Sequence, residues 1–288
     1  MDGHDDNYEQ ASVRQFVNSA IKEIKIAFEK VKVTDQLPFE NIREKMIPII
    51  NDMSRHPDLD HILTQLKRQD ENTYRHSIGV ALISNIIGKV KGLCPQEIQE
   101  LTSAAFLHDI GKVKIPDEII HKPGKLTNEE FALIQNHTIY GYEMISQTPG
   151  LSHRQALVAL QHHEREDGSG YPFGLRGNDI DPYSKIIAIA DVFHAMISKR
   201  SYKKTVPFYK VLQDMSMNAY GTLEPSTTLC FLRRIMEMLI GHDVVLSNGC
   251  EGKIVMVNPN NPVYPLVEVN GKYIDLSKDL SVSLDRLV

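Results

Sequence analysis

The sequence predicts a mainly α-helical protein that ends in a small β-rich module. Three observations predict this class. Apolar residues recur every three or four positions in residues 10–33, helix start signals repeat from about residue 70 to residue 240, and short β-branched runs follow residue 243. We therefore expect a helical N-terminal region at 1–65, a helical domain at 66–242 and the β-rich module at 243–288.

The N-terminal region is expected to begin with an amphipathic helix over residues 10–33. Its apolar stripe consists of Val13, Phe16, Val17, Ala20, Ile21, Ile24, Phe28 and Val31. A second helical stretch follows, but proline interrupts helices because it lacks an N–H donor and its ring clashes with the preceding turn. We therefore expect Pro38, Pro48 and Pro57 to break residues 35–57 into short pieces.

Helix start signals recur in the central region. Two of them are capping boxes, in which a Ser or Thr and a Glu or Gln three residues later each satisfy a backbone donor at the helix start. The signals are Pro95, Thr127 with Glu130, Ser152 with Gln155, and Asp181 followed by Pro182. We expect Gly241 to end the last helix, and the Gly- and Pro-rich residues 167–177 to form a loop between helices.

The C-terminal module is expected to contain short strands at residues 253–257, 266–269 and 272–276. The first two are β-branched runs, and the Asn270-Gly271 pair before the third is a strong signal for a type I′ hairpin. We expect the N-terminal and C-terminal regions to regulate the protein or to form a homodimer.

The composition excludes several classes of protein. The chain carries 32 Lys and Arg against 37 Asp and Glu, a formal charge of −5, and lacks the basic excess expected of a protein that binds a nucleic-acid polymer. Its most apolar stretch, residues 186–197, contains Asp191 and His194 and is too short to cross a bilayer, so no membrane span is expected. Acidic residues at the start argue against a secretory peptide, and we expect a cytoplasmic protein. The three cysteines are far apart and indicate neither a disulfide framework nor a thiolate zinc site.

Histidines and aspartates in apolar helical segments form the candidate site. Four apolar residues precede His108-Asp109, and five precede Asp191, so these polar groups would be buried at a cost unless something satisfies them. A metal cluster would satisfy them together. The candidate ligands are His76, His108, Asp109, His137, His162, His163 and Asp191.

Imidazole and carboxylate ligands suit divalent iron, manganese, zinc, nickel or cobalt. Seven ligands exceed the needs of one tetrahedral ion, whereas two ions about 3.5 to 4 Å apart can share a carboxylate, for which Asp109 is the candidate. A single helical histidine is more often a hydrogen-bonded core or surface residue, and Asp191 alone is equally well explained as a structural partner. We expect the structural role for His4, His56, His61, His121, His153 and His242.

Two segments carry a resemblance to a known family. Residues 108–112 read HDIGK, and residues 162–172 read HHEREDGSGYP. Together they resemble the HD-GYP subgroup of the HD-domain metal-dependent phosphohydrolases, over roughly residues 70–215. The resemblance implies an HD-domain helical bundle, cyclic di-GMP phosphodiesterase activity and two or three divalent metal ions, with iron or manganese ahead of zinc, nickel and cobalt.

The resemblance also implies roles for individual residues. The seven candidate ligands would hold the metals, and Lys112 would act with Asp109 in catalysis by meeting a phosphate oxygen. Tyr171, in the Gly-Tyr-Pro loop, would stack on a guanine, and Arg200 and Lys203 would contact the substrate phosphates. The alternatives without a substrate contact are that Tyr171 packs against the loop and that the basic residues are solvent-exposed surface residues. The same loop would contact diguanylate cyclase domains.

Three positions depart from the family pattern. Asn72 stands one helical turn before His76, where three-metal members have a Glu, and this favours two metals. His194 stands where the family commonly has an acid, and Ser201 stands where it usually has a proline. These two departures affect the fine geometry and the substrate preference, but they leave every predicted two-metal ligand in place.

The expected reaction is hydrolysis of cyclic di-GMP by a hydroxide that bridges the two metals, giving the linear dinucleotide pGpG and, after a second cut, GMP. Two alternatives remain at the level of sequence. The chain could be an HD-type phosphohydrolase of another nucleotide, or a catalytically weak signalling adaptor that binds a cyclic dinucleotide. The complete ligand set argues against the adaptor.

Overall fold

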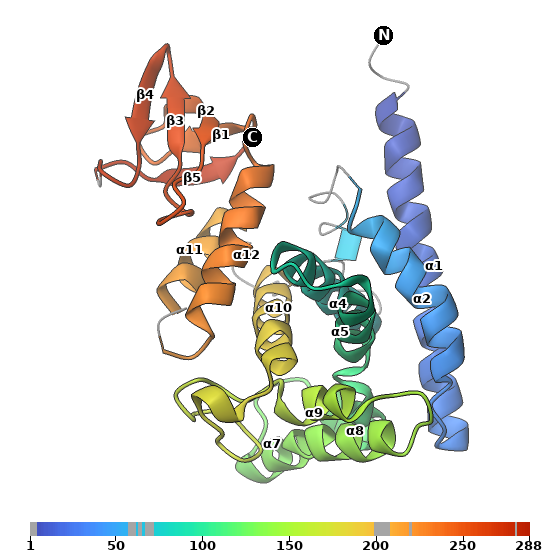
Figure 1. The fold of residues 1–288 in the computed structure, drawn as a ribbon. Helices are drawn as coiled ribbons and strands as arrows, with labels where there is room; N and C mark the ends of the chain where they lie inside the picture. Colours follow the sequence, from blue (N-terminus) through green and yellow to red (C-terminus); the bar gives the residue numbers. More distant parts are fainter. Residues whose placement is uncertain are drawn as a thin grey trace. The chain divides into compact units, whose positions relative to one another are not determined.

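The structure is a computed structural model that describes residues 5–56, 62, 65–66, 72–198, 208–218, 221–279 and 281–288. The chain divides into two compact units, Met1–Ser198 and Lys199–Val288. Figure 1 shows that both contain helices and that the strands belong to the second. The chain is mainly α-helical with a small C-terminal sheet, as predicted. The boundary between the units falls within residues 66–242.

Two long helices begin the first unit, α1 (Asp5–Thr34) and α2 (Phe39–Met53), and they pack against each other. The prediction that prolines break this region into short pieces is wrong for Pro48, which lies inside a continuous α2. An internal proline costs roughly 3 kcal/mol. Packing offsets this cost because Pro48 itself is exposed while the other face of α2 is buried. The buried residues of that face are Phe39, Ile42, Met46, Ile47, Ile50 and Met53.

Five helices form the rest of the bundle. They are α4 (Asn72–Val90), α5 (Pro95–Leu107), α8 (His137–Ser146), α9 (His153–Gln161) and α10 (Pro182–Ser198). Helix α4 packs against α5 and α10, and α9 packs against α5, α8 and α10. Short elements connect them: η1 (Ile110–Lys114), α6 (Asp117–Ile120), α7 (Asn128–Gln135) and η2 (Gly177–Asp179). None of the helices that the structure describes combines the length and apolar character needed to span a membrane.

The predicted start signals are confirmed. Pro95 is the first residue of α5, and Thr127 and Ser152 each accept a hydrogen bond from the backbone N–H three residues later. The Glu130 and Gln155 side chains complete both capping boxes. These local signals fix where α5, α7 and α9 begin, and the ends of α5 and α9 lie next to the candidate ligands.

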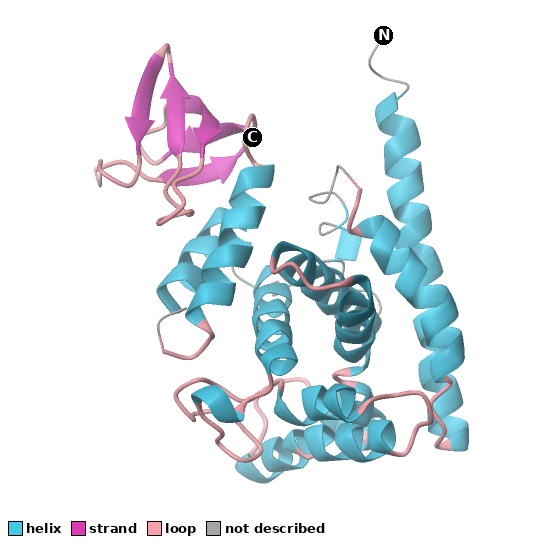
Figure 2. Cartoon of the chain, in the orientation of Figure 1, coloured by secondary structure: helices cyan, strands magenta, loops and turns pink. Residues whose placement is uncertain are grey.

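The second unit contains α11 (Phe208–Asn218), α12 (Pro225–Met238) and an antiparallel sheet in the order β4-β3-β2-β1-β5. The strands are β1 (Asp243–Leu246), β2 (Glu251–Met256), β3 (Leu266–Val269), β4 (Lys272–Asp275) and β5 (Leu284–Leu287), drawn in magenta in Figure 2.

The β3–β4 hairpin confirms the predicted turn, since Asn270 and Gly271 have φ of 50° and 76° as a type I′ turn requires. Strands β1 and β5 were not predicted. Helix α12 ends at Met238, three residues before Gly241, so the helix is shorter than predicted.

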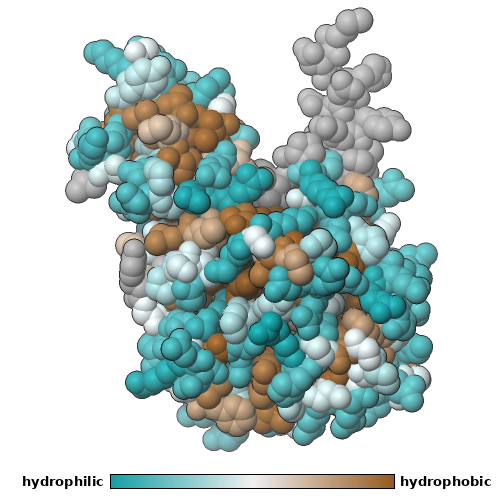
Figure 3. Space-filling model, viewed as in Figure 1, coloured by the Kyte–Doolittle hydropathy of each residue, from teal (hydrophilic) through white to brown (hydrophobic). Residues whose placement is uncertain are grey.

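Figure 3 shows hydrophobic side chains gathered over the sheet. Met256 in β2 is one exposed hydrophobic residue of the sheet, with 54% of its surface accessible.

Candidate metal centre

The seven predicted ligands lie on elements that are far apart in the chain. His76 is in α4, His108 and Asp109 follow the end of α5, His137 begins α8, His162 and His163 follow α9, and Asp191 is in α10. The structure brings them together in one cluster, in which His76 and His163 are partly exposed and the other five side chains are buried. Asp109 is shared by two sets of side chains whose possible ligand atoms lie within 4.8 Å of one another. We call these sets the His137 group (His137, His162 and His163) and the His76 group (His76 and His108).

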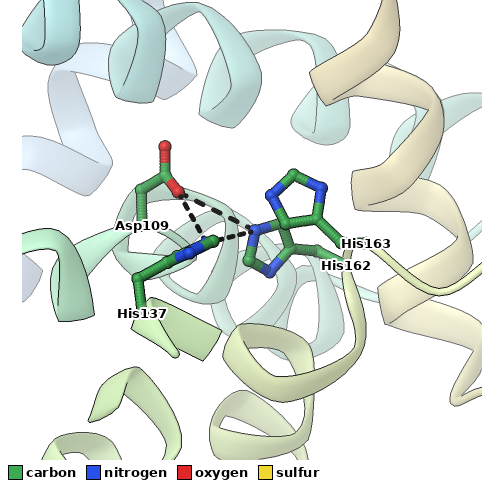
Figure 4. A group of neighbouring side chains, drawn as sticks. All are labelled: Asp109, His137, His162 and His163. Atoms are coloured by element: carbon green, nitrogen blue, oxygen red, sulfur yellow. Dashed lines mark hydrogen bonds and ion pairs between the residues drawn. The ribbon is translucent and has the colours of Figure 1, made fainter. Parts of the chain in front are cut away.

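The His137 group faces one oxygen of Asp109. Oδ1 of Asp109 lies 3.3 Å from Nε2 of His137 and 3.8 Å from Nε2 of His162, and these two nitrogens are 3.4 Å apart. Figure 4 shows the carboxylate and the three imidazoles converging on a common space from different elements. Imidazole nitrogens and carboxylate oxygens are donor atoms that first-row divalent metals accept.

The His76 group faces the other oxygen. Oδ2 of Asp109 lies 3.3 Å from Nε2 of His108 and 3.9 Å from Nε2 of His76. Asp191 also approaches an imidazole of each group. Its Oδ1 lies 2.9 Å from Nε2 of His76, and its Oδ2 lies 3.9 Å from Nδ1 of His163. Asp109 and Asp191 therefore each border both groups of imidazoles, and Asp109 lies between the two groups.

Three of the imidazoles are oriented by the last turn of a preceding helix. The Nδ1 atoms of His108, His137 and His162 lie 2.7, 2.6 and 3.0 Å from the carbonyl oxygen three residues earlier in the chain. A carbonyl can only accept, so Nδ1 carries the proton and Nε2 keeps its lone pair. Helix ends provide such carbonyls because the last turn has no further N–H groups to bind them. The position of these histidines at helix ends thus turns Nε2 toward the cluster.

Both carboxylates are ionised although they are buried. Burial alone would raise the pKa of Asp109, but the Lys112 ammonium and the His108 imidazole outweigh it and hold that pKa well below its ordinary value. Burial likewise works against ionisation of Asp191, and the hydrogen bond from His76 holds the pKa of Asp191 well below its ordinary value. The centre therefore offers two negative charges to a cation.

The imidazoles of the His137 group suit metal binding. Burial lowers the pKa of His162 well below its ordinary value, and the neighbouring His163 adds to the shift. Burial also lowers the pKa of His163, to about 3, against the opposing effect of Asp191. Both rings are neutral at neutral pH, which is the form that binds a metal ion. His108 differs: burial opposes its charged form, but Asp109 beside it raises its pKa.

Two buried atoms test whether these residues fit a metal. Nε2 of His108 and Oδ1 of Asp109 are buried and make no hydrogen bond within the part of the chain that the structure describes. An unpaired buried polar atom costs about 1 to 3 kcal/mol. A divalent ion at the centre would satisfy both, and mixed imidazole and carboxylate donors are typical of first-row divalent metals. The residues present therefore fit a divalent metal centre.

Lys112 and Tyr171, which were predicted to contact substrate, lie at the cluster. Nζ of Lys112 is 2.6 Å from Oδ2 of Asp109. The Tyr171 ring lies 4.6 Å from the ring of His163, tilted by 30°. Burial raises the pKa of Tyr171, and the charge of Asp109 adds to this, so the phenol stays protonated. Tyr171 therefore covers one side of the His137 group.

The other predicted positions give a mixed picture. Arg200, Ser201 and Lys203 lie outside the described residues, as does the side chain of Asn72. Three histidines that were expected to lie outside the cluster, His121, His153 and His242, are exposed.

Glu164 was given no role from the sequence, yet it anchors the loop that carries Tyr171. It is 2% exposed, and its two carboxylate oxygens accept hydrogen bonds of 2.8 and 3.0 Å from the backbone N–H groups of Phe173 and Leu175. Gly170 allows the loop to approach, because a Cβ there would lie 2.4 Å from Cα of Glu164. The signal in the sequence was an acid directly after two candidate ligands in an apolar segment, because a buried acid must find its own partners.

His194 is the second residue whose role the sequence left open. It is fully buried in α10, and its Nδ1 lies 3.1 Å from Nδ1 of His76. It therefore lies on the side of the His76 ring away from Nε2 and Asp191. Among the described residues, neither of the two sets that could hold an ion includes His194.

The sequence of the chain is similar to those of several known phosphodiesterases. The chain is 34% identical over 215 residues to a cyclic di-GMP phosphodiesterase of Pseudomonas aeruginosa, covering 75% of this chain and 52% of that protein. It is 34% identical over 220 residues to a cyclic di-GMP phosphodiesterase of Thermotoga maritima, covering 75% and 56%. A 3′3′-cGAMP-specific phosphodiesterase of Vibrio cholerae is 36% identical over 183 residues, covering 63% and 34%. The chain spans about half the length of the first two relatives.

The fold and the family are shown by two further comparisons. A solved structure of a Bdellovibrio bacteriovorus protein described as HDG"Y"P has a similar fold, with a TM-score of 0.62 at 20% identity, covering 80% of this chain and 72% of that chain. The family model described as HD domain matches residues 46–225, which is more than half of the chain. The chain therefore belongs to the HD domain family.

Proposed function

We propose that the chain hydrolyses a 3′,5′ phosphodiester bond of a cyclic dinucleotide, with cyclic di-GMP as the first candidate and the linear dinucleotide pGpG as the product. The observation that carries the proposal is the position of Asp109, whose two oxygens face two separate groups of imidazoles. Two ions that share one carboxylate are typical of enzymes that cleave phosphodiesters. Relatives named as cyclic di-GMP and 3′3′-cGAMP phosphodiesterases support the substrate class.

We assign the ligands by group. The His137 group and Asp109 would hold one ion, and the His76 group with Asp109 and Asp191 would hold the other. Iron or manganese is our first choice, with zinc, nickel or cobalt as alternatives, because imidazole and carboxylate donors accept all five. When bound, the two ions supply Lewis acidity that lowers the pKa of a water and stabilises charge on the phosphoryl oxygens.

The residues around the ligands would bind the substrate. Lys112, beside Oδ2 of Asp109, can turn its ammonium to a phosphate oxygen and stabilise the negative charge that develops there. Tyr171 presents an aromatic ring above His163, where a guanine can stack. We also assign phosphate contacts to Arg200 and Lys203.

We place the catalytic domain at residues 66–242, with regulatory or dimerising roles for residues 1–65 and 243–288. Contacts between the Gly-Tyr-Pro loop and diguanylate cyclase domains stay a prediction. Support for a contact role of this loop is Phe173, whose side chain is 63% exposed.

The decisive experiment is anaerobic incubation of the purified, metal-analysed chain with cyclic di-GMP, 3′3′-cGAMP and a linear dinucleotide, followed by chromatography of the products. We expect a linear dinucleotide from a cyclic one, and GMP as well if the product is cut again. Cleavage of the linear dinucleotide without cleavage of either cyclic dinucleotide would instead identify a phosphohydrolase of another nucleotide. Tight binding without turnover, with either iron or manganese present, would identify a binding adaptor.

A further inference from the structure

The mid-helix ligand His76 differs from the three helix-end imidazoles in how its Nδ1 is supported. Helix α4 continues through His76, so the carbonyls one turn back are bonded by the helix's own N–H groups. His76 therefore cannot use the local carbonyl that orients His108, His137 and His162. Its Nδ1 lies instead 3.1 Å from Nδ1 of His194, which comes from α10, 118 positions later in the chain.

Helix α10 contacts both ends of the His76 ring. Asp191 lies 2.9 Å from Nε2, and His194, three residues later on the same face of α10, reaches Nδ1. An imidazole that binds a metal through Nε2 must keep its proton on Nδ1, and a hydrogen-bond acceptor there fixes both tautomer and ring orientation. With an ion at Nε2, the proton of His76 would be on Nδ1, and Nδ1 of His194, 3.1 Å away, is placed to accept it.

Helix α4 provides the space for this contact at Gly79. A Cβ at Gly79 would lie 2.1 Å from both Cδ2 and Nε2 of His194, closer than packed atoms approach. Gly79 is one turn after His76, so the absence of a side chain there lets the His194 ring approach α4 beside its partner. The fully buried ring is thus held in a site shaped for it.

We propose that His194 is the positioning residue of the metal centre, which accepts the Nδ1 hydrogen of His76 and directs Nε2 of His76 at the ion. This inference rests on the proposed two-metal function. A role for His194 as a direct ligand does not fit, because its Nδ1 faces the side of His76 opposite to Asp191.

The test compares three substitutions of similar size in the full chain. In His194→Asn the amide occupies the position of imidazole Nδ1 and keeps an acceptor there. His194→Leu has the same branching as Asn without the acceptor, and the amide of His194→Gln reaches the position of Nε2 instead. Ser198→Ala is the control, because Oγ of Ser198 lies 3.3 Å from the same Nδ1 of His194. Binding of Mn²⁺ to the metal-free proteins is measured by competition with a chelator, and circular dichroism checks the fold.

We expect two binding events in the natural chain, one of which weakens about 10- to 100-fold in the Leu and Gln variants, as for other partners of metal-binding histidines. The Asn variant and Ser198→Ala should stay within about threefold. If the Leu variant does not fold, the Asn and Gln variants carry the same comparison. Unchanged affinity in all variants, or equal loss in Asn and Leu, would overturn the positioning role. Absence of Mn²⁺ binding by the natural chain would instead overturn the proposed function.

Discussion

The two groups of ligands on either side of Asp109 are built in different ways. In the His137 group, His137 and His162 are oriented by carbonyls at the end of a preceding helix, three residues back. In the His76 group, His108 is oriented in the same way, but His76 depends on α10, a helix distant in the chain. A ligand oriented locally keeps its direction whenever its helix forms, whereas a ligand oriented at a distance also requires the packing of two helices. The predictions below separate the two groups.

The largest effect is expected where the groups meet. Replacing both His108 and Asp109 with Ala removes the carboxylate that both groups share. We expect phosphodiesterase activity to fall by about 1,000-fold or more, since metal ions contribute several kcal/mol to such reactions. Bound metal should fall as well, while the circular dichroism spectrum persists. The exposed His121, replaced with Ala, is the control. Retained turnover in the double variant would refute the site.

Lys112 lies on the His76 side of Asp109. Changing it to Gln removes the cation that we propose contacts the substrate phosphate, without removing a ligand, so activity should fall by about 100-fold. Metal content, measured by plasma mass spectrometry, should be retained. A loss of metal equal to that of the double variant would show that Lys112 serves only to hold Asp109.

Tyr171 covers the His137 group. Its replacement with Leu should raise KM for the cyclic dinucleotide by about tenfold, because base stacking on an aromatic ring contributes about 1 to 3 kcal/mol. Metal content should not change. Tyr273, exposed on β4, is the matched control for the same substitution. If the metal content of the Tyr171 variant falls to the same extent as its substrate use, the ring is a packing element of the centre.

The smallest effect concerns the stability of the metal-free chain. The pKa of His163 is lowered to about 3, against about 6.5 in an unfolded chain. Between these values the unfolded chain takes up a proton that the folded chain does not, so stability falls as the pH is lowered through this window.

His163→Asn should reduce the slope of unfolding free energy against pH by up to about 1.4 kcal/mol per pH unit between about pH 6 and pH 4. Chemical denaturation in the presence of a chelator measures it. His121→Asn should leave the slope unchanged, and the prediction is wrong if both variants behave alike.

Local signals carried most of the fold from the sequence. The capping residues Thr127 and Ser152 mark helix starts because their side chains bond backbone groups only three residues away. The Asn270-Gly271 turn is local in the same sense. The prediction for Pro48 was wrong because burial of the other face of α2 outweighs the local cost. Strands β1 and β5 were missed because each is four residues long and their pairing joins residues about 40 positions apart.

The sequence was sufficient to predict which residues belong to the candidate site, but not how these residues are arranged. Buried His and Asp in apolar segments identified the cluster and Asp109 as the candidate shared carboxylate, yet nothing local could indicate which imidazoles lie on each side of Asp109. His194 was noted only as a departure from the family pattern, because its contact with His76 depends on the packing of α10 on α4. The role of Glu164 likewise depends on a loop that folds back on it.

The bonds from imidazole Nδ1 to helix-end carbonyls link metal loading to the order of the helix ends. Electron withdrawal by an ion at Nε2 makes the Nδ1 hydrogen of the same ring a stronger donor. The terminal turns that precede His108, His137 and His162 would then fray less in the loaded chain. Slower hydrogen exchange in those three turns, against unchanged exchange in the C-terminal sheet, is how a loaded centre would reveal itself even in the absence of substrate.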